Sequence, residues 1–163
     1  LLSPPAPRLG YGEDTHRLVA GRPLVLGGVT IPFHLGLLGH SDADALAHAA
    51  MDAMLGACAL GDIGKLFPDT DPQYAGICSL TLLTQVLRRT LAQGYALSNL
   101  DATIVAQQPK LAPHIPAMRA KLAAAMACGQ ERISIKATTP EGCGPEGALE
   151  SITVRCVCSM EAI

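Results

Sequence analysis

The sequence predicts one α/β or α+β domain, a single compact unit with a mixed β-sheet covered by helices on one face. Segments of strand and helix character alternate along the 163 residues, without internal repeats or a linker. Apolar residues make up 49% of the chain and charged residues 16%, a balance typical of a globular protein. We therefore expect residues 1–7 to form a disordered leader and residues 8–163 to form the domain.

The first part of the chain predicts two β segments. Residues 8–13 have the character of a short first strand. Residues 23–31 (PLVLGGVTI) are β-like, and Gly27–Gly28 marks a turn or a bulge between their apolar halves. Residues 37–42 then form a loop that leads into a helix.

A long helix is predicted from about Asp42 to Leu60. Ser41, with Asp44 three residues later, has the spacing of a capping box in which Asp replaces Glu. The helical period places four apolar residues on one core face: Leu46, Ala50, Ala53 and Ala57.

The rest of the chain predicts two helices and three strands. Residues 61–72 form a long polar connector, and connectors of this length inside a domain are often functional. Gly94 and Gly129 are expected to end the two helices, and Pro113 suits the first turn of the second. The predicted elements are a helix over 80–92, a strand over 95–107, a helix over 113–128, and strands over 132–137 and 151–158 joined by a Gly-rich loop.

Composition excludes several classes of function. The net charge is −2 and no basic run exceeds Arg88–Arg89, so the basic face of a nucleic-acid-binding protein is missing. Aromatic residues make up 3% of the chain, too few for base-stacking surfaces. No apolar stretch approaches the roughly 18 residues that a membrane span needs. Six cysteines without a C-x-x-C motif are interpreted as small buried hydrophobic residues in a reducing compartment.

Three residues form a candidate metal site. Asp14 and His16 follow the first strand and, two apart in extended chain, point to the same side. His48 lies on the long helix between Asp44 and Asp52, four residues from each, so the three side chains are expected to form one polar stripe opposite the apolar face. One of these carboxylates is expected to hold the second ring nitrogen of His48. Two histidines and one aspartate suit zinc with one coordination position left open. The spacing alone also fits unrelated polar residues.

Longer motifs carry a resemblance to a known family. They are GYGEDTH (10–16), LGHSDAD (38–44) with His48, GDIGKLFPDTDP (61–72), AQQPKL (106–111) and KATTPE (136–141). Together they closely resemble the 2-C-methyl-D-erythritol 2,4-cyclodiphosphate synthase family of the non-mevalonate isoprenoid pathway. The likeness runs from Arg8 onward, and residues 61–72 are its most specific part.

The resemblance implies a phosphorus–oxygen lyase that forms homotrimers, with the sheets facing inward and each active site between two subunits. The implied reaction converts 4-diphosphocytidyl-2-C-methyl-D-erythritol 2-phosphate to the 2,4-cyclodiphosphate and releases CMP. It also implies a nucleotide-linked small-molecule substrate, and neither nucleic acid nor membrane as a partner. The expected location is a bacterial cytoplasm, with a plastid-type organelle as the alternative.

Residue roles follow from the same matches. Asp14, His16 and His48 take the positions of the zinc ligands, and Glu141 that of the ligand to a second divalent ion, magnesium or manganese. With Thr139, these four form the expected catalytic set. The matches expected to bind substrate are His40, Ser41, Asp62, Ile63, Gly64, Phe67 and Asp69 beside the metal, and Ala106, Lys110, Leu111, Ala137, Thr138 and Thr139 in a cytidine and phosphate pocket from the adjoining subunit.

Several of these residues have plainer interpretations. Asp62 is also typical of a turn or helix end, Lys110 of a solvated loop, and Thr138 and Thr139 of a strand end. The sequence departs from the family at Pro145, where a Phe is common, and at Ala148, where an Arg is common. Those positions line a cavity on the trimer axis in relatives, so the axial ligand of this chain stays open.

Two other functions remain as alternatives. A metal-dependent phosphate-ester hydrolase would use the same three ligands, but it does not explain a nucleotide pocket at 106–111. A metal-stabilised trimeric binding module is the second alternative, although a structural zinc is usually closed by four protein ligands and only three are in position.

Overall fold

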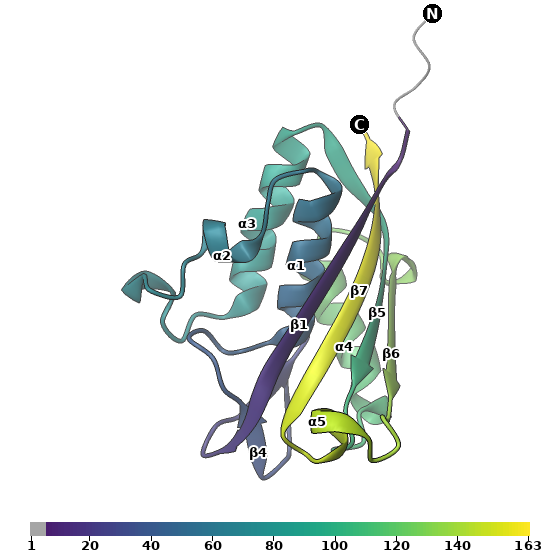
Figure 1. Cartoon of the computed structure of the whole chain (residues 1–163). Coiled ribbons are helices and arrows are strands. Elements are labelled where there is room, and N and C mark those ends of the chain that lie inside the picture. The colour runs from purple at the N-terminus through teal and green to yellow at the C-terminus, as the bar shows by residue number, and fades with distance from the viewer. Residues whose placement is uncertain (1–5) are drawn as a thin grey trace, which may run out of the picture.

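A five-stranded mixed sheet organises the chain (Figure 1). The computed structural model describes residues 6–163, so most of the predicted leader, residues 1–5, lies outside the described residues. Neighbouring strands are antiparallel except for one parallel pair, β5 and β6, at one side of the sheet. In spatial order the strands are β4 (Leu35–Leu37), β1 (Arg8–Ala20), β7 (Ser151–Ala162), β5 (Tyr95–Val105) and β6 (Ile133–Thr138).

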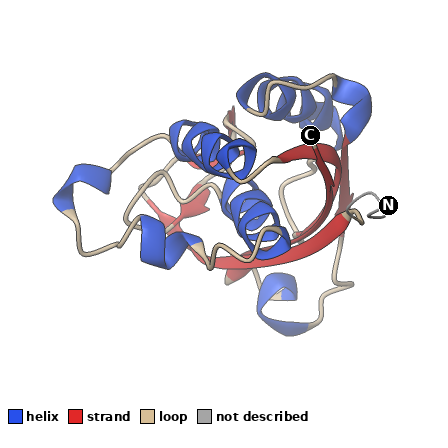
Figure 2. Cartoon of the chain, turned by 90° about the horizontal axis from the view of Figure 1, so that it is seen from above, coloured by secondary structure: helices blue, strands red, loops and turns tan. Residues whose placement is uncertain are grey.

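Three helices cover one face of this sheet (Figure 2). They are α1 (Ala45–Ala57) against β1 and β7, α3 (Ser79–Ala92) beside α1, and α4 (Ile115–Ala125) against β6. The short α5 (Gly144–Gly147) lies in front of the opposite face, near the start of β7 (Figure 1). The predicted α+β domain with a mixed sheet is confirmed. Smaller elements are the hairpin β2 (Leu24–Leu26) and β3 (Val29–Ile31), α2 (Ile63–Leu66), and the 3₁₀ turns η1 (Pro72–Tyr74), η2 (Ala112–His114) and η3 (Gln130–Arg132).

The closest packing in the fold joins α1 to β1. A Cβ atom added at Gly10 would lie 1.8 Å from the carbonyl oxygen of Ala53, and one at Gly12 would lie 2.0 Å from that of Ala49. No real side chain fits at either position, so the helix backbone rests directly on the strand backbone. The alanines of α1 and the glycines of β1 therefore act as a matched pair of small surfaces.

Nearly all residues of α1 are buried. The four residues of the predicted core face are buried, which confirms that prediction, but only Asp52 and Gly56 of the whole helix are not buried. The helix lies between the sheet and the other helices. Its many small apolar residues allow it to be packed on nearly every side. The expected polar stripe along Asp44, His48 and Asp52 is therefore wrong: the three side chains point into three different packed environments.

Several predicted element boundaries are wrong for identifiable reasons. β1 continues to Ala20 because β7 pairs with it as far as Arg17, so Asp14 and His16 lie within the strand and not after it. β4 falls partly in the predicted loop over 37–42, because three residues of pairing leave little sequence signal. The polar connector over 61–72 contains α2.

Helix ends also differ from the prediction. Asp44, and not Ser41, caps α1, because its side chain accepts a hydrogen bond from the backbone N–H of Ala47. α4 ends at Ala125 and not at Gly129, since Ala127 takes the left-handed conformation (φ 52°) that closes a helix. The predicted ends at Gly94, and the turn at Gly27–Gly28, are confirmed by positive φ angles.

The cysteines fall into three groups: three are buried, two are exposed, and Cys128 is half-buried. Cys58, Cys156 and Cys158 are buried, as predicted, and burial raises the pKa of the Cys158 thiol to about 12. Cys78 and Cys143 are exposed, which contradicts the prediction, because both stand in the residue just before a helix. All six are free thiols.

Residues 6–163 contain no helix that is both long enough and apolar enough to span a membrane.

The contact between α1 and β1 generates a stability prediction. Gly12→Ala should lower the free energy of unfolding by about 1–3 kcal/mol or more, because the added methyl group overlaps the Ala49 carbonyl. Gly56→Ala is the matched control: its Cβ would have 3.9 Å to its nearest neighbour, so it should be neutral or stabilise by about 0.5–1 kcal/mol. Urea unfolding measures both. Equal effects of the two changes would contradict the packing argument.

Candidate metal centre and substrate cavities

β1 directs Asp14 and His16 toward the helices. Residues at even positions of this strand, from Gly10 to Leu18, face α1, whereas the odd positions are largely exposed. Because the strand lacks side chains at Gly10 and Gly12, α1 approaches closely enough for His48 to reach the same point. The site therefore depends on the extended backbone of β1 at Asp14 and His16. It also depends on the close packing of α1 against Gly10 and Gly12.

Three donor atoms converge there. Asp14 Oδ2 lies 2.8 Å from His16 Nε2 and 3.1 Å from His48 Nδ1, and the two ring nitrogens are 3.2 Å apart. Donors around a tetrahedral zinc ion with bonds of about 2.0–2.1 Å stand about 3.3 Å apart, so only a slight spreading is required. Within residues 6–163, this is the group of three side chains whose geometry could hold a metal ion.

Electrostatics favour the ionised carboxylate. Burial alone would raise the pKa of Asp14, but hydrogen bonds and attraction to His16 and His48 lower it to about 2. For His16, burial would lower the pKa, and the Asp14 carboxylate raises it overall. Because the carboxylate stabilises the protonated imidazole, a cation at this point must displace protons to bind.

The tautomer of His16 is determined by a backbone contact. Its Nδ1 lies 2.7 Å from the carbonyl oxygen of Leu38, which can only accept a hydrogen bond, so Nδ1 carries the proton. The Nε2 lone pair is then free for a metal ion. Gly39 is required beside this ring, because a Cβ there would lie 3.0 Å from His16 Cε1.

The predicted partners of His48 are wrong. Asp44 is fully buried and accepts hydrogen bonds from the backbone N–H groups of Gly27, Gly28 and Ala47. Asp52 accepts one from Ile63. Each carboxylate thus binds a nearby loop backbone and neither contacts the imidazole.

The actual neighbours of His48 Nε2 are two hydroxyl groups. Ser79 Oγ lies at 2.9 Å and Ser41 Oγ at 3.3 Å. Ser79, at the start of α3, was missed by the sequence analysis, because a serine 31 positions from His48 carries no local signal of contact.

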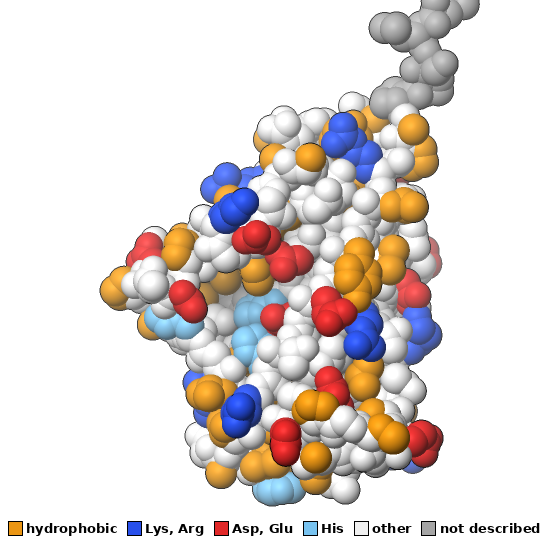
Figure 3. Space-filling view, viewed as in Figure 1, with side chains coloured by type: hydrophobic (Ala, Val, Ile, Leu, Met, Phe, Trp, Pro, Cys, Tyr) orange, Lys and Arg blue, Asp and Glu red, His pale blue; other side chains and the backbone are white. Residues whose placement is uncertain are grey.

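The triad lies in a hollow of the surface, where Figure 3 shows histidine and acidic side chains together. The cavity has a volume of about 400 Å³ and is bounded by the loop after β4 and by the connector around α2. The cavity is lined by six of the seven residues predicted to bind substrate beside the metal: His40, Ser41, Ile63, Gly64, Phe67 and Asp69. The seventh, Asp62, does not line it, because its side chain caps α2 by accepting the N–H of Lys65.

Contacts around the connector shape this cavity. His40 Nε2 lies 3.0 Å from the carbonyl oxygen of Asp71, and the rings of Phe67 and Tyr74 meet edge to face at 5.4 Å. Tyr74 also lines the cavity and was not predicted. A tyrosine two residues after the polar connector is the signal that could have indicated it.

A second cavity, of about 430 Å³, lies at the carboxyl ends of the parallel strands β5 and β6. Carboxyl ends of neighbouring parallel strands are a common place for ligands to bind. Here the structure brings together all six residues predicted for the nucleotide pocket: Ala106, Lys110, Leu111, Ala137, Thr138 and Thr139.

Glu141 stands just beyond this second cavity. Its backbone has a positive φ of 53°, and its carboxylate accepts a hydrogen bond from Thr139 Oγ1 at 3.3 Å. The Gly142 N–H donates to Gln107 Oε1 at 2.9 Å, which ties the loop to the end of β5. Glu141 is exposed and is not part of the three-donor cluster.

Within one chain, the two cavities lie far apart along the sheet. Asp14 pairs in register with Val154, which pairs with Ile104, which in turn pairs with Ala137. Three strand spacings of about 4.8 Å, or ~14 Å in all, therefore separate the metal donors from the second cavity along the sheet. The chain does not bring Glu141 to the triad.

A mixed sheet with an Asp–His–His donor set open to a cavity defines a candidate metalloenzyme. Comparison with known proteins identifies the family. The sequence model of the YgbB family matches residues 7–161. The 2-C-methyl-D-erythritol 2,4-cyclodiphosphate synthase of Geobacter sulfurreducens is 58% identical over 154 residues, which cover 94% of this chain and 98% of that protein. The chain belongs to the YgbB family and is an enzyme.

Solved structures show the same fold. A 2C-methyl-D-erythritol-2,4-cyclodiphosphate synthase in its CDP-bound form has a TM-score of 0.87 at 43% identity, covering 94% of this chain and 100% of that one. The bifunctional IspDF of Campylobacter jejuni has a TM-score of 0.94 at 39% identity over 97% of this chain. This chain spans 43% of that longer protein.

Removal of one donor tests the metal centre. His48→Ala should weaken zinc binding by more than the roughly 10–100-fold cost of losing an outer-sphere partner, because a ligand itself is lost. Metal analysis of the purified protein gives the zinc content. His34→Ala is the control, since His34 is exposed and outside the cluster. Full zinc occupancy in His48→Ala would remove His48 from the site.

Proposed function

We propose that this enzyme converts 4-diphosphocytidyl-2-C-methyl-D-erythritol 2-phosphate to 2-C-methyl-D-erythritol 2,4-cyclodiphosphate and releases CMP, as a step of non-mevalonate isoprenoid precursor synthesis. The observation that carries the proposal is the convergence of Asp14, His16 and His48 at an open cavity. The names of the curated relatives and the CDP-bound neighbour support it. A bacterial cytoplasm stays the predicted location.

The reaction requires charge neutralisation and alignment. An oxygen of the 2-phosphate attacks the β-phosphorus in line, the bond to the CMP oxygen breaks, and no protein nucleophile takes part. Bound zinc at the triad and a second divalent ion at Glu141 would neutralise phosphate charge. The protein must therefore hold a highly charged substrate folded on itself.

The first cavity supplies groups for the methylerythritol phosphate end. Ser41 is half-buried beside the triad and offers a hydroxyl to a phosphate oxygen. His40 offers ring nitrogens next to it, and its link to Asp71 orients the ring. Gly64 leaves backbone accessible for close contact with a diol. Asp62 serves this end through α2, whose start it caps, and its free oxygen is the proposed hydroxyl acceptor.

The second cavity supplies groups for the cytidine diphosphate end. Lys110 brings a positive charge for phosphate, and Leu111 with Ala106 forms an apolar floor. The hydroxyl of Thr139 stands between this cavity and Glu141, where it can contact the bridging phosphate. A nucleotide needs such a mixture of apolar surface and a few directed polar groups.

These two cavities act together only across a subunit boundary. Because they lie on opposite sides of one rigid sheet, a substrate that binds both must bridge two chains. A head-to-tail contact of this kind closes into a ring when the rotation is right, and we propose a homotrimer. The sheet face away from the helices supports it: Leu9, Tyr11 and Val157 are large apolar residues left 74%, 56% and 47% exposed there.

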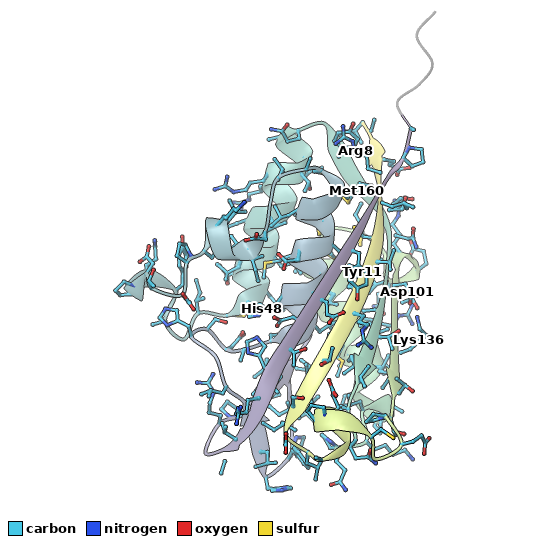
Figure 4. The ribbon with its side chains drawn as sticks, viewed as in Figure 1. Arg8, Tyr11, His48, Asp101, Lys136 and Met160 are labelled. Atoms are coloured by element: carbon cyan, nitrogen blue, oxygen red, sulfur yellow. The ribbon has the colours of Figure 1, made fainter. Side chains whose placement is uncertain are left out.

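Charged groups on the same face fit an inward-facing sheet. Tyr11, Asp101 and Lys136 lie on this side (Figure 4), and Lys136 pairs with Asp101. Arg155 Nε lies 3.2 Å from Glu13 Oε2. These pairs neutralise charge that three facing sheets would otherwise bring together. Pro145 lies in the first turn of α5, and Ala148 is the residue that caps its end.

Product analysis tests the proposed reaction. Purified enzyme with the diphosphocytidyl substrate should release CMP and the cyclic diphosphate in equal amounts, because the leaving group and the ring form in one step. A chelator should abolish both, and added zinc with magnesium should restore them. CMP with a linear bisphosphate would indicate the hydrolase instead. Absence of CMP from the metal-loaded protein would leave a binding module.

Mixed assemblies test the division of the site. His48→Ala and Glu141→Gln should each be inactive alone, because each damages a different half. After the two are unfolded and refolded together, about one quarter of subunit boundaries should combine the two intact halves, and activity should return to about that fraction. Mixing two preparations of His48→Ala is the control. No recovery in verified mixed trimers would place both halves in one chain.

A further inference from the structure

Behind the metal donors, three polar side chains form a continuous line. His48 Nε2 lies 2.9 Å from Ser79 Oγ, and Ser79 Oγ lies 2.5 Å from Asp42 Oδ1. The line starts on α1, passes through the first residue of α3 and ends in the loop before α1. Ser79 is fully buried, so water does not replace either contact.

The direction of the hydrogen bonds follows from the acceptor at the end. An ionised carboxylate can only accept, so the Ser79 hydroxyl donates to Asp42. The Ser79 oxygen is then left to accept, and its nearer remaining neighbour is the ring nitrogen of His48 at 2.9 Å, whereas the Ser41 hydroxyl lies at 3.5 Å. Nε2 must therefore carry a proton, and the lone pair of His48 lies on Nδ1, the atom that faces Asp14 and His16.

We propose that Ser79 and Asp42 are positioning residues that orient His48 and select the tautomer in which Nδ1 binds the metal ion. This inference rests on the metal centre of the proposed function. Hydrogen bonding of a ligating histidine through its second nitrogen is a general means of orienting the ring and raising its basicity. Here a buried hydroxyl transmits the influence of the carboxylate, in place of a direct carboxylate contact.

The contacts of Asp42 exceed what a helix cap requires. Its Oδ2 accepts the backbone N–H of Ser79 at 2.9 Å, which replaces the side-chain cap that Cys78 does not provide. That single contact would satisfy the start of α3. The second contact, from Oδ1 to the hydroxyl, adds nothing to the cap and instead aligns the serine with His48.

The same arrangement leaves the Ser41 hydroxyl without a strong hydrogen bond to His48. Two hydroxyls compete for the one proton on His48 Nε2, and Ser79 is closer, at 2.9 Å against 3.3 Å. Because Ser79 receives that proton, the Ser41 hydroxyl stays available to donate into the cavity it lines. Loss of Ser79 should turn Ser41 toward His48 and so impair substrate binding as well as metal binding.

Zinc affinity tests the proposal without reliance on turnover. Competition with a chromophoric chelator should show zinc bound 10–100-fold more weakly by Ser79→Ala and by Asp42→Asn than by the unchanged protein. The visible spectrum of the cobalt-substituted proteins should change in both. The double variant should be no weaker than Ser79→Ala alone, because Asp42 acts through Ser79.

Thr90→Val is the matched control, since it removes another fully buried hydroxyl from α3, one that donates to Leu87 far from the site. It should lower the thermal midpoint of the metal-free protein yet keep zinc affinity within threefold. Zinc affinity within threefold for both Ser79→Ala and Asp42→Asn would overturn the proposal, and where one fails to fold, the other decides. A wild-type protein that binds no zinc would instead overturn the metal centre of the proposed function.

Discussion

The whole site depends on the backbone contact between α1 and β1. Without side chains at Gly10 and Gly12, the carbonyl groups of Ala49 and Ala53 reach the strand. His48 therefore lies within 3.2 Å of two side chains on the neighbouring strand. Close packing of this kind resists deformation, so the donors are arranged before an ion binds.

Four carboxylates near this contact have four different roles, and their surroundings decide which. Asp14 faces two imidazoles, and its pKa is lowered to about 2. Asp44 is fully buried, which raises its pKa, and three backbone N–H groups partly offset that burial. Asp42 binds the start of α3, and Asp52 binds the start of α2. Only the first is available to a cation.

The sequence predicted the three side chains that the structure brings together as candidate metal donors, because their signal is local or lies in long motifs. Asp14 and His16 are two apart in extended chain, and that geometry holds even though the strand is longer than predicted. Residues 106–111 and 137–139 line one cavity because they end two adjacent parallel strands. The two-residue repeat of a strand predicts that Asp14 and His16 share a side. The order of the elements predicts that the two strand ends meet.

The rest could not be predicted because it depends on contacts between distant segments. Helical spacing placed Asp44 and Asp52 near His48 along the axis, yet each carboxylate turns to a loop whose position is set by tertiary packing. The true neighbour, Ser79, lies in another helix. Similarly, β1 is extended by β7, a strand more than a hundred residues away. Local propensity does not record such pairings.

Rigidity also explains why the proposed substrate should bind between chains. The sheet holds β1 and β6 at a fixed separation, because the ladders through β7 and β5 pair the backbone groups between them. A hinge inside the domain would disturb the packing that holds the three donors. The proposed assembly would avoid both costs, because each chain would keep one half of the site fixed and an interface would set the distance between the halves. The sheet that separates the halves within a chain would then align them between chains.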